Sequence, residues 1–175
     1  MKWQPLWAAG VAGAALAPVS VHATVYLTVA QAQQLLFPRQ TLQPVALALS
    51  EDEQKALKKA SSIYHPFAGQ VWRSADKGWL VVDQVLGKHE MITYAVALNA
   101  DGSVRQIEIL EYKETYGGQV RNLDWRSQFT GKTAASPLKL NQDIRNISGA
   151  TLSCRHLTDG VKRVLTLHAR KLRTL

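Results

Sequence analysis

The chain has 175 residues and a net charge of +8 at pH 7, from 21 lysines and arginines against 13 aspartates and glutamates. Its single cysteine, Cys154, excludes an internal disulfide, and neither it nor the five histidines shows the spacing of a metal site. The length suits one domain with its own hydrophobic core. The positive charge favours anionic partners such as phosphates, lipid headgroups or acidic proteins.

The N-terminus has the pattern of a secretory signal peptide, which we assign to residues 1–23. Lys2 precedes an apolar run from Leu6 to Val21, and Val21-His22-Ala23 presents small or modest residues where a signal peptidase cuts. We predict cleavage after Ala23 and a periplasmic or otherwise exported protein; an uncleaved N-terminal anchor is the alternative. Export argues against nucleic acid as the partner of the positive charge.

Two helices are predicted at the start of the exported chain by their capping residues. Thr28 suits the N-cap of a helix that runs through Leu36. Ser50 and Glu53 form the pattern of a capping box, which opens a second helix. We treat residues 24–66 as an N-terminal helical segment and expect its two helices to form one cap or subdomain.

Strands are predicted next along the chain. Residues 70–73 can pair with residues 79–86 across a short turn. In residues 90–98 the pattern has period two, with Ile92, Tyr94, Val96 and Leu98 on one face. A turn with Gly102 available for positive φ then leads into a partner strand over residues 104–112. The second pair predicts a hairpin at the centre of a mainly antiparallel sheet.

The remaining elements are predicted to be short until the C-terminal helix. We expect a short helix over residues 122–129, short strands over 138–140 and 144–147, and an amphipathic helix over about 152–172. One face of the long helix carries Leu157, Val161, Val164, Leu165 and His168. Its many basic residues suit either a solvated face or a docking patch for an acidic partner or anionic lipid. The whole pattern predicts an α+β fold with N-terminal helices, a mainly antiparallel sheet and a C-terminal amphipathic helix.

The segment Ser148-Gly149-Ala150-Thr151-Leu152-Ser153 places hydroxyl residues beside two very small residues at the predicted start of that helix. A helix N-terminus offers free N–H groups and the positive end of a dipole to a phosphate, and Gly149 and Ala150 allow close approach to the backbone. The segment therefore suits a phosphate carried on, or held beside, Thr151. A hydroxyl N-cap after a small-residue turn is the alternative interpretation.

Three pieces of the sequence resemble the FMN-binding domain family, which includes the small extracytoplasmic subunits of sodium-pumping NADH:quinone oxidoreductase and of Rnf-type electron transport complexes. Ser148-Gly149-Ala150-Thr151 resembles the flavinylation motif of that family, and Glu114-Thr115-Tyr116-Gly117 resembles its Glu-Thr-Pro-Gly loop. The family's Trp-x3-Phe-x-Gly-Lys segment is matched by Trp125, Phe129, Gly131 and Lys132. The pieces occur in the family order and span about residues 91–167.

Two positions differ from the family pattern. Arg145 stands where family members usually have an Asp three residues before the Ser, and the nearest Asp is Asp143. Tyr116 stands in place of the Pro of the loop. The first difference concerns recognition by the enzyme that attaches the flavin, and the second concerns the shape of the loop.

The resemblance implies that FMN is the cofactor and that a separate flavin transferase esterifies its phosphate to Thr151. It also implies that residues 67–175 form the FMN-binding domain. The residues it assigns to the phosphate end are Ser148, Gly149, Ala150, Leu152 and Ser153, and those it assigns to the ring are Glu114, Thr115 and Gly117. Trp125 has two interpretations: it stacks on the flavin ring, or it is a core residue.

These inferences predict an exported electron carrier with no catalytic residue of its own, which relays electrons between a membrane-bound redox partner and an acceptor. A flavin-dependent reductase with its own small substrate is an alternative. The sequence argues against it, because it contains no Gly-x-Gly-x-x-Gly nucleotide fingerprint and no acid–base dyad. A binding module of the same fold without the flavin attachment is a further alternative, which Arg145 supports. Peripheral contact with a membrane remains one reading of the basic C-terminal helix.

Overall fold

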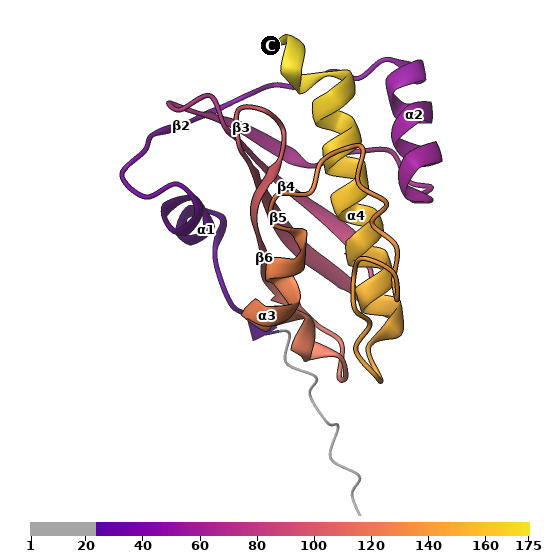
Figure 1. The fold of residues 1–175 in the computed structure, drawn as a ribbon. Coiled ribbons are helices and arrows are strands. Elements are labelled where there is room, and N and C mark those ends of the chain that lie inside the picture. Colours follow the sequence, from indigo (N-terminus) through magenta and orange to yellow (C-terminus); the bar gives the residue numbers. More distant parts are fainter. Residues whose placement is uncertain (1–23) are drawn as a thin grey trace, which may run out of the picture.

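An antiparallel sheet organises residues 24–175, the part of the chain that the computed structural model describes (Figure 1). The predicted signal peptide and its cleavage site lie outside the described residues. Within residues 24–175, six strands pair in the order β1-β6-β5-β4-β3-β2. They are β1 (Thr24–Val25), β2 (Leu42–Pro44), β3 (Gln70–Ser74), β4 (Trp79–Leu86), β5 (Met91–Leu98) and β6 (Val104–Tyr112). The predicted α+β class is confirmed.

Four α-helices accompany the sheet in the same range. They are α1 (Val29–Leu36), α2 (Glu51–Ser61), α3 (Leu123–Arg126) and α4 (Thr151–Arg170), with short 3-10 turns at Gly118–Arg121, Ser127–Phe129 and Leu172–Thr174. Both predicted N-terminal caps are confirmed, because Thr28 and Ser50 each form a complete capping box. No helix among these residues is long and apolar enough to cross a membrane.

The predicted hairpins are confirmed and form the centre of the sheet. β3 pairs with β4, and β5 pairs with β6 across the turn in which Gly102 has φ 83°. Alternate residues of β5 face α4 and are fully buried, as the period-two pattern predicts: Ile92, Tyr94, Val96 and Leu98. The apolar face of α4 packs on this surface and buries Val161, Val164 and Leu165, as predicted.

The two N-terminal helices lie on opposite faces of the sheet, so the expectation that they form one cap is wrong (Figure 1). α1 buries Ala32 and Leu36 against the face that carries Leu80 and Leu110. α2 packs beside α4 on the other face, through Leu57. The chain between the helices crosses the sheet edge as β2. The edge strands β1 and β2 were not predicted, because two or three residues are too few to show alternation.

The strands predicted over residues 138–140 and 144–147 are not formed; this region is a loop with an isolated bridge between Leu140 and Ile144. The reason is the carboxylate of Asp143, which accepts hydrogen bonds from the backbone N–H groups of Leu138 at 3.1 Å and Lys139 at 2.7 Å. A side chain therefore satisfies the donors that strand pairing would have used. The helix predicted over residues 122–129 is divided into α3 and a 3-10 turn.

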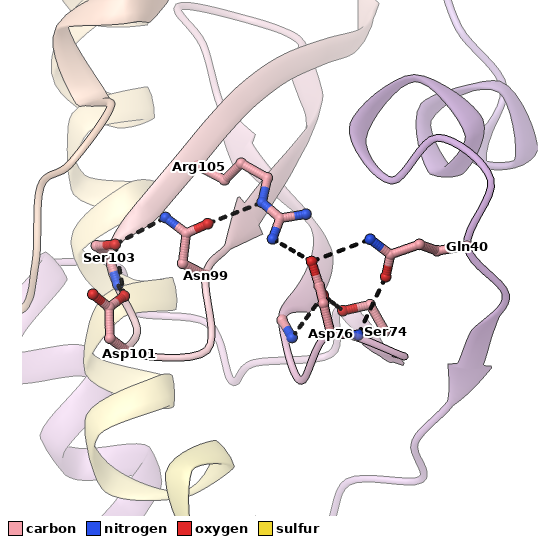
Figure 2. Close-up of polar contacts among 8 residues, drawn as sticks. Gln40, Ser74, Asp76, Asn99, Asp101, Ser103 and Arg105 are labelled. Atoms are coloured by element: carbon pink, nitrogen blue, oxygen red, sulfur yellow. Dashed lines mark hydrogen bonds and ion pairs between the residues drawn. The ribbon is translucent and has the colours of Figure 1, made fainter.

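A polar network joins the turns at one end of the sheet (Figure 2). Asp76, in the β3–β4 turn, accepts hydrogen bonds from Arg105 Nη2 at 2.6 Å and from Gln40 Nε2 at 3.1 Å. Arg105 in turn donates through Nε to Asn99 Oδ1 at 2.9 Å. The hydrogen bond from the Ser74 hydroxyl holds the pKa of Asp76 well below its usual range. Partial burial opposes this effect, and the hydrogen bonds from Arg105 and Gln40 add to it. The carboxylate thus links three segments of the chain.

We predict that Asp76→Asn lowers the free energy of unfolding by about 1 kcal/mol at pH 7, a modest value because the pair is partly exposed. Because the pKa of Asp76 is depressed in the folded protein, its contribution is present above the unfolded-state pKa of about 4 and declines as the pH falls below it. Urea titrations of both proteins should therefore show the difference narrowing as the pH falls from 4 to 2. A difference that stays the same between pH 7 and pH 2 would contradict the prediction.

Candidate functional site: the cleft at the start of α4

Thr151 is the first residue of α4 and lies within its first turn. The N-cap position is Ala150, which makes no side-chain capping bond, so the interpretation of Thr151 as an N-cap is wrong. The N–H groups of Thr151, Leu152 and Ser153 have no acceptor inside the helix, as in any first turn. Thr151 is exposed, and its Oγ1 accepts one hydrogen bond, from Asn146 Nδ2 at 3.0 Å. The hydroxyl and the free donors of the turn therefore lie together.

A cleft of about 400 Å³ opens at this helix start. Its lining comes from three segments: Lys88 and His89 in the β4–β5 turn, residues 114–116 after β6, and residues 149–153. The structure thus brings together two of the pieces that the sequence analysis singled out, the Glu-Thr-Tyr-Gly loop and the Ser-Gly-Ala-Thr segment. A Cβ built on Gly149, at φ 81°, would meet no atom within 4 Å, so the backbone there is open to a ligand.

The carboxylate of Glu114 supports the cleft from one side. Its Oε1 accepts hydrogen bonds from the backbone N–H of His89 at 2.6 Å and of Glu90 at 3.1 Å. Burial raises the pKa of Glu114, but these backbone donors outweigh it, and the net pKa is lowered. The carboxylate is therefore ionised and holds the turn that presents Lys88 and His89 to the cleft. Glu114 therefore lines the cleft and also acts as an anchor for this turn.

Gly117 brings the loop into direct contact with the Ser-Gly-Ala-Thr segment. It has φ 91°, and a Cβ there would lie 2.5 Å from Tyr112 Oη and 3.0 Å from the Cβ of Ala150. Tyr112 Oη donates to the carbonyl of Tyr116 at 2.6 Å and lies 3.0 Å from Ser153 Oγ. The buried phenol group of Tyr112 therefore connects β6, the loop and the first turn of α4.

The structure does not bring all the predicted residues into the cleft. Trp125 is 4% exposed, packs edge-on against Phe129 and donates through Nε1 to the carbonyl of Arg145 at 2.8 Å, which matches its core interpretation. Arg145 turns its side chain toward Gln128 Oε1, at 3.3 Å, and away from the cleft. Ser148 is exposed and lies just outside the lining.

Sequence reasoning missed four residues of this region: Lys88, His89, Tyr112 and Asn146. Lys88 and His89 stand in a turn between two predicted strands, so turn position and charge were the available signals. Nothing in the local sequence places Tyr112 or Asn146 against α4, because both contacts depend on how the loops fold back.

Residues 87–166 match the model of the FMN-binding domain family. This range begins at the β4–β5 turn and includes both the Glu114 loop and Thr151. This segment of the chain is an FMN-binding domain, and the match supports FMN as its cofactor. A comparison with curated proteins found no match. The cleft fits the cofactor chemically, because it offers unpaired first-turn N–H groups, two basic side chains and open backbone at Gly149 to a phosphate.

We predict that Gly117→Ala lowers the free energy of unfolding by about 2–3 kcal/mol, because the new methyl group collides with Tyr112 and Ala150 in addition to straining the backbone. Gly131→Ala is the matched control: Gly131 has φ 76°, and its added Cβ would meet nothing within 4 Å, so about 1 kcal/mol is expected. Chemical denaturation measures both. Equal losses in the two variants would show that the close contact at Gly117 has no cost.

Proposed function

We propose that this protein is an exported electron carrier in which FMN is attached through its phosphate to Thr151. The observation that carries the proposal is the exposed Thr151 hydroxyl in an uncapped first helical turn, inside the cleft of an FMN-binding domain. A covalent link suits a protein outside the cytoplasm, because a flavin that dissociates there is lost.

The attachment is a phosphoryl transfer from a flavin dinucleotide, catalysed by a separate transferase. Thr151 Oγ1 attacks the phosphorus of the FMN half, and a new P–O bond forms. The anhydride bond to the other nucleotide breaks, and that mononucleotide leaves with the electron pair. The hydroxyl proton passes to a base of the transferase.

After attachment, this chain's own residues would hold the phosphate and orient the flavin. The N–H groups of Leu152 and Ser153, with the helix dipole, stabilise its negative charge. Lys88 and His89 line the cleft and add basic side chains, and the Glu114 carboxylate holds the backbone of their turn. The bound FMN supplies the electron-transfer chemistry.

A carrier fits the cleft better than a reductase with its own substrate. Glu114 is the acidic residue in the lining, and its Oε1 is occupied by two backbone N–H groups, so it is poorly placed for proton transfer. The rim also carries exposed apolar side chains, with Tyr116 80% and Leu152 39% exposed. We infer that this rim meets a membrane-bound redox partner, with Arg155 and Lys88 favouring an acidic surface or anionic headgroups.

We predict that Thr151→Ala abolishes the covalent flavin when the protein and a flavin transferase are produced together, whereas Thr151→Ser retains part of it because a hydroxyl remains. Since Thr151 is not a cap, the alanine variant should change the free energy of unfolding by less than about 1 kcal/mol.

Intact-mass measurement and in-gel flavin fluorescence report the adduct. Thr130→Ala, which removes an exposed threonine hydroxyl outside the cleft lining, is the control and should keep full modification. An adduct that maps to another residue, or wild-type protein without flavin from its native host, would overturn the assignment.

We predict that the protein isolated from its native host is exported and begins at or near Thr24, because residues 1–23 have the order of a cleavable signal. N-terminal sequencing of the fractionated protein tests this. The control is a variant in which a start methionine replaces residues 1–23, and this variant should stay in the cytoplasm. Wild-type protein recovered from the cytoplasm with an intact Met1 would contradict the prediction.

A further inference from the structure

One neighbouring side chain holds the hydroxyl of Thr151. Asn146 lies on the loop that leads into α4, and its Nδ2 donates to Thr151 Oγ1 at 3.0 Å. The Thr151 side chain is otherwise exposed, so this contact is what orients the hydroxyl within the cleft.

The same Asn146 has an unusual environment. Its Oδ1 is buried and has no hydrogen-bond partner among residues 24–175. A buried amide oxygen without a partner destabilises a folded protein, and such atoms in native structures call for an explanation. The amide is therefore placed for its contact with Thr151 at a cost to its own hydrogen bonding.

We propose that Asn146 is a positioning residue that orients the Thr151 hydroxyl for attachment of FMN; this inference rests on the proposed function. A hydroxyl has one hydrogen to donate and two lone pairs. The Asn146 N–H occupies one lone pair. The second lone pair is then free to attack phosphorus, and the O–H is free to donate to the base of the transferase.

Asn146 keeps this positioning role during the transfer step. As the bond from Thr151 Oγ1 to the FMN phosphorus forms, the anhydride bond of the flavin dinucleotide breaks and the mononucleotide leaves. The proton goes to the transferase, and Oγ1 becomes an ester oxygen. Asn146 neither gains nor loses an atom. It contributes by restricting the rotation of the Thr151 side chain about its Cα–Cβ bond, so that the nucleophile is already aligned.

The test is the rate at which purified transferase and a flavin dinucleotide modify the exported chain. Asn146→Ala should lower kcat about tenfold, which is about 1.4 kcal/mol in the barrier, at an unchanged KM for the acceptor protein. Asn122→Ala is the matched control, since Asn122 lines the same hollow as Asn146, and it should react at the wild-type rate. A wild-type kcat for Asn146→Ala, or an equal loss in Asn122→Ala, would overturn the proposal.

Asn146→Asp supplies a readout that a purely structural role would not move. Its carboxylate has the shape of the amide and can accept the Thr151 hydroxyl hydrogen once it is ionised. The transfer rate of this variant should therefore rise with pH through a carboxyl titration, whereas Asn146→Ala should show no such step. A rate for Asn146→Asp that is no more dependent on pH than that of Asn146→Ala counts against positioning by Asn146.

The hydrogen bond itself is testable without the transferase. Thr151→Val removes the hydroxyl and keeps the side-chain shape, so the NMR signals of the Asn146 side-chain amide should shift while those of Asn122 stay in place. If the amide signals of Asn146 do not move, the positioning role of Asn146 is overturned, while the proposed attachment of FMN to Thr151 still stands. A wild-type chain that takes up no flavin would overturn the proposed function, and the role of Asn146 with it.

Discussion

The position of the cleft depends on how closely α4 packs against the sheet. Gly160 lies against the ring of Tyr94, where a Cβ would stand 2.5 Å from the phenol oxygen. One turn further along, Arg163 is 1% exposed and lies 3.6 Å from the carboxylate of Asp83, which also accepts a hydrogen bond from Tyr94 at 3.3 Å. Burial raises the pKa of Asp83, and Arg163 opposes that rise. Because a buried charge requires its partner, this pair fixes α4 along its axis and so determines where Thr151 stands.

Several residues that match the family's sequence pattern serve here as structural supports around the cleft. The Glu114 carboxylate accepts a hydrogen bond from the backbone of the β4–β5 turn, and the indole N–H of Trp125 donates to the carbonyl of Arg145. Gly117 removes bulk between the loop and α4. A loop that exposes its backbone to a ligand needs such anchors, because loops are otherwise the most mobile parts of a domain. These supports are distant in sequence from the segments that they hold, because Glu114 holds the turn at His89 and Trp125 holds the carbonyl of Arg145.

The sequence was most informative where structure follows from local chemistry. Two capping boxes, the hairpin of β5 and β6, and the buried face of α4 were predictable from residue type and spacing. It was least informative where a side chain replaced a backbone partner, as Asp143 does in the region predicted as strands. It also could not show that α1 and α2 separate to opposite faces, because each helix has only one apolar stripe and either face accepts it. The cleft followed the same rule: its chain segments were recognisable, but the contacts of Lys88 and Asn146 depend on tertiary folding.

The missing N-cap of α4 has a consequence for the stability of the protein when no ligand is bound in the cleft. A helix that begins at Ala150 without a capping side chain lacks about 1 kcal/mol that a Ser or Asp would supply. This lower stability affects α4, the longest helix of the described chain. It affects the N-terminal end of α4, which is the end farther from the ion pair of Arg163 with Asp83. A phosphate ester at the next residue would accept the same N–H groups that a cap accepts. If FMN is attached as proposed, the loaded protein would resist unfolding and proteolysis better than the empty one.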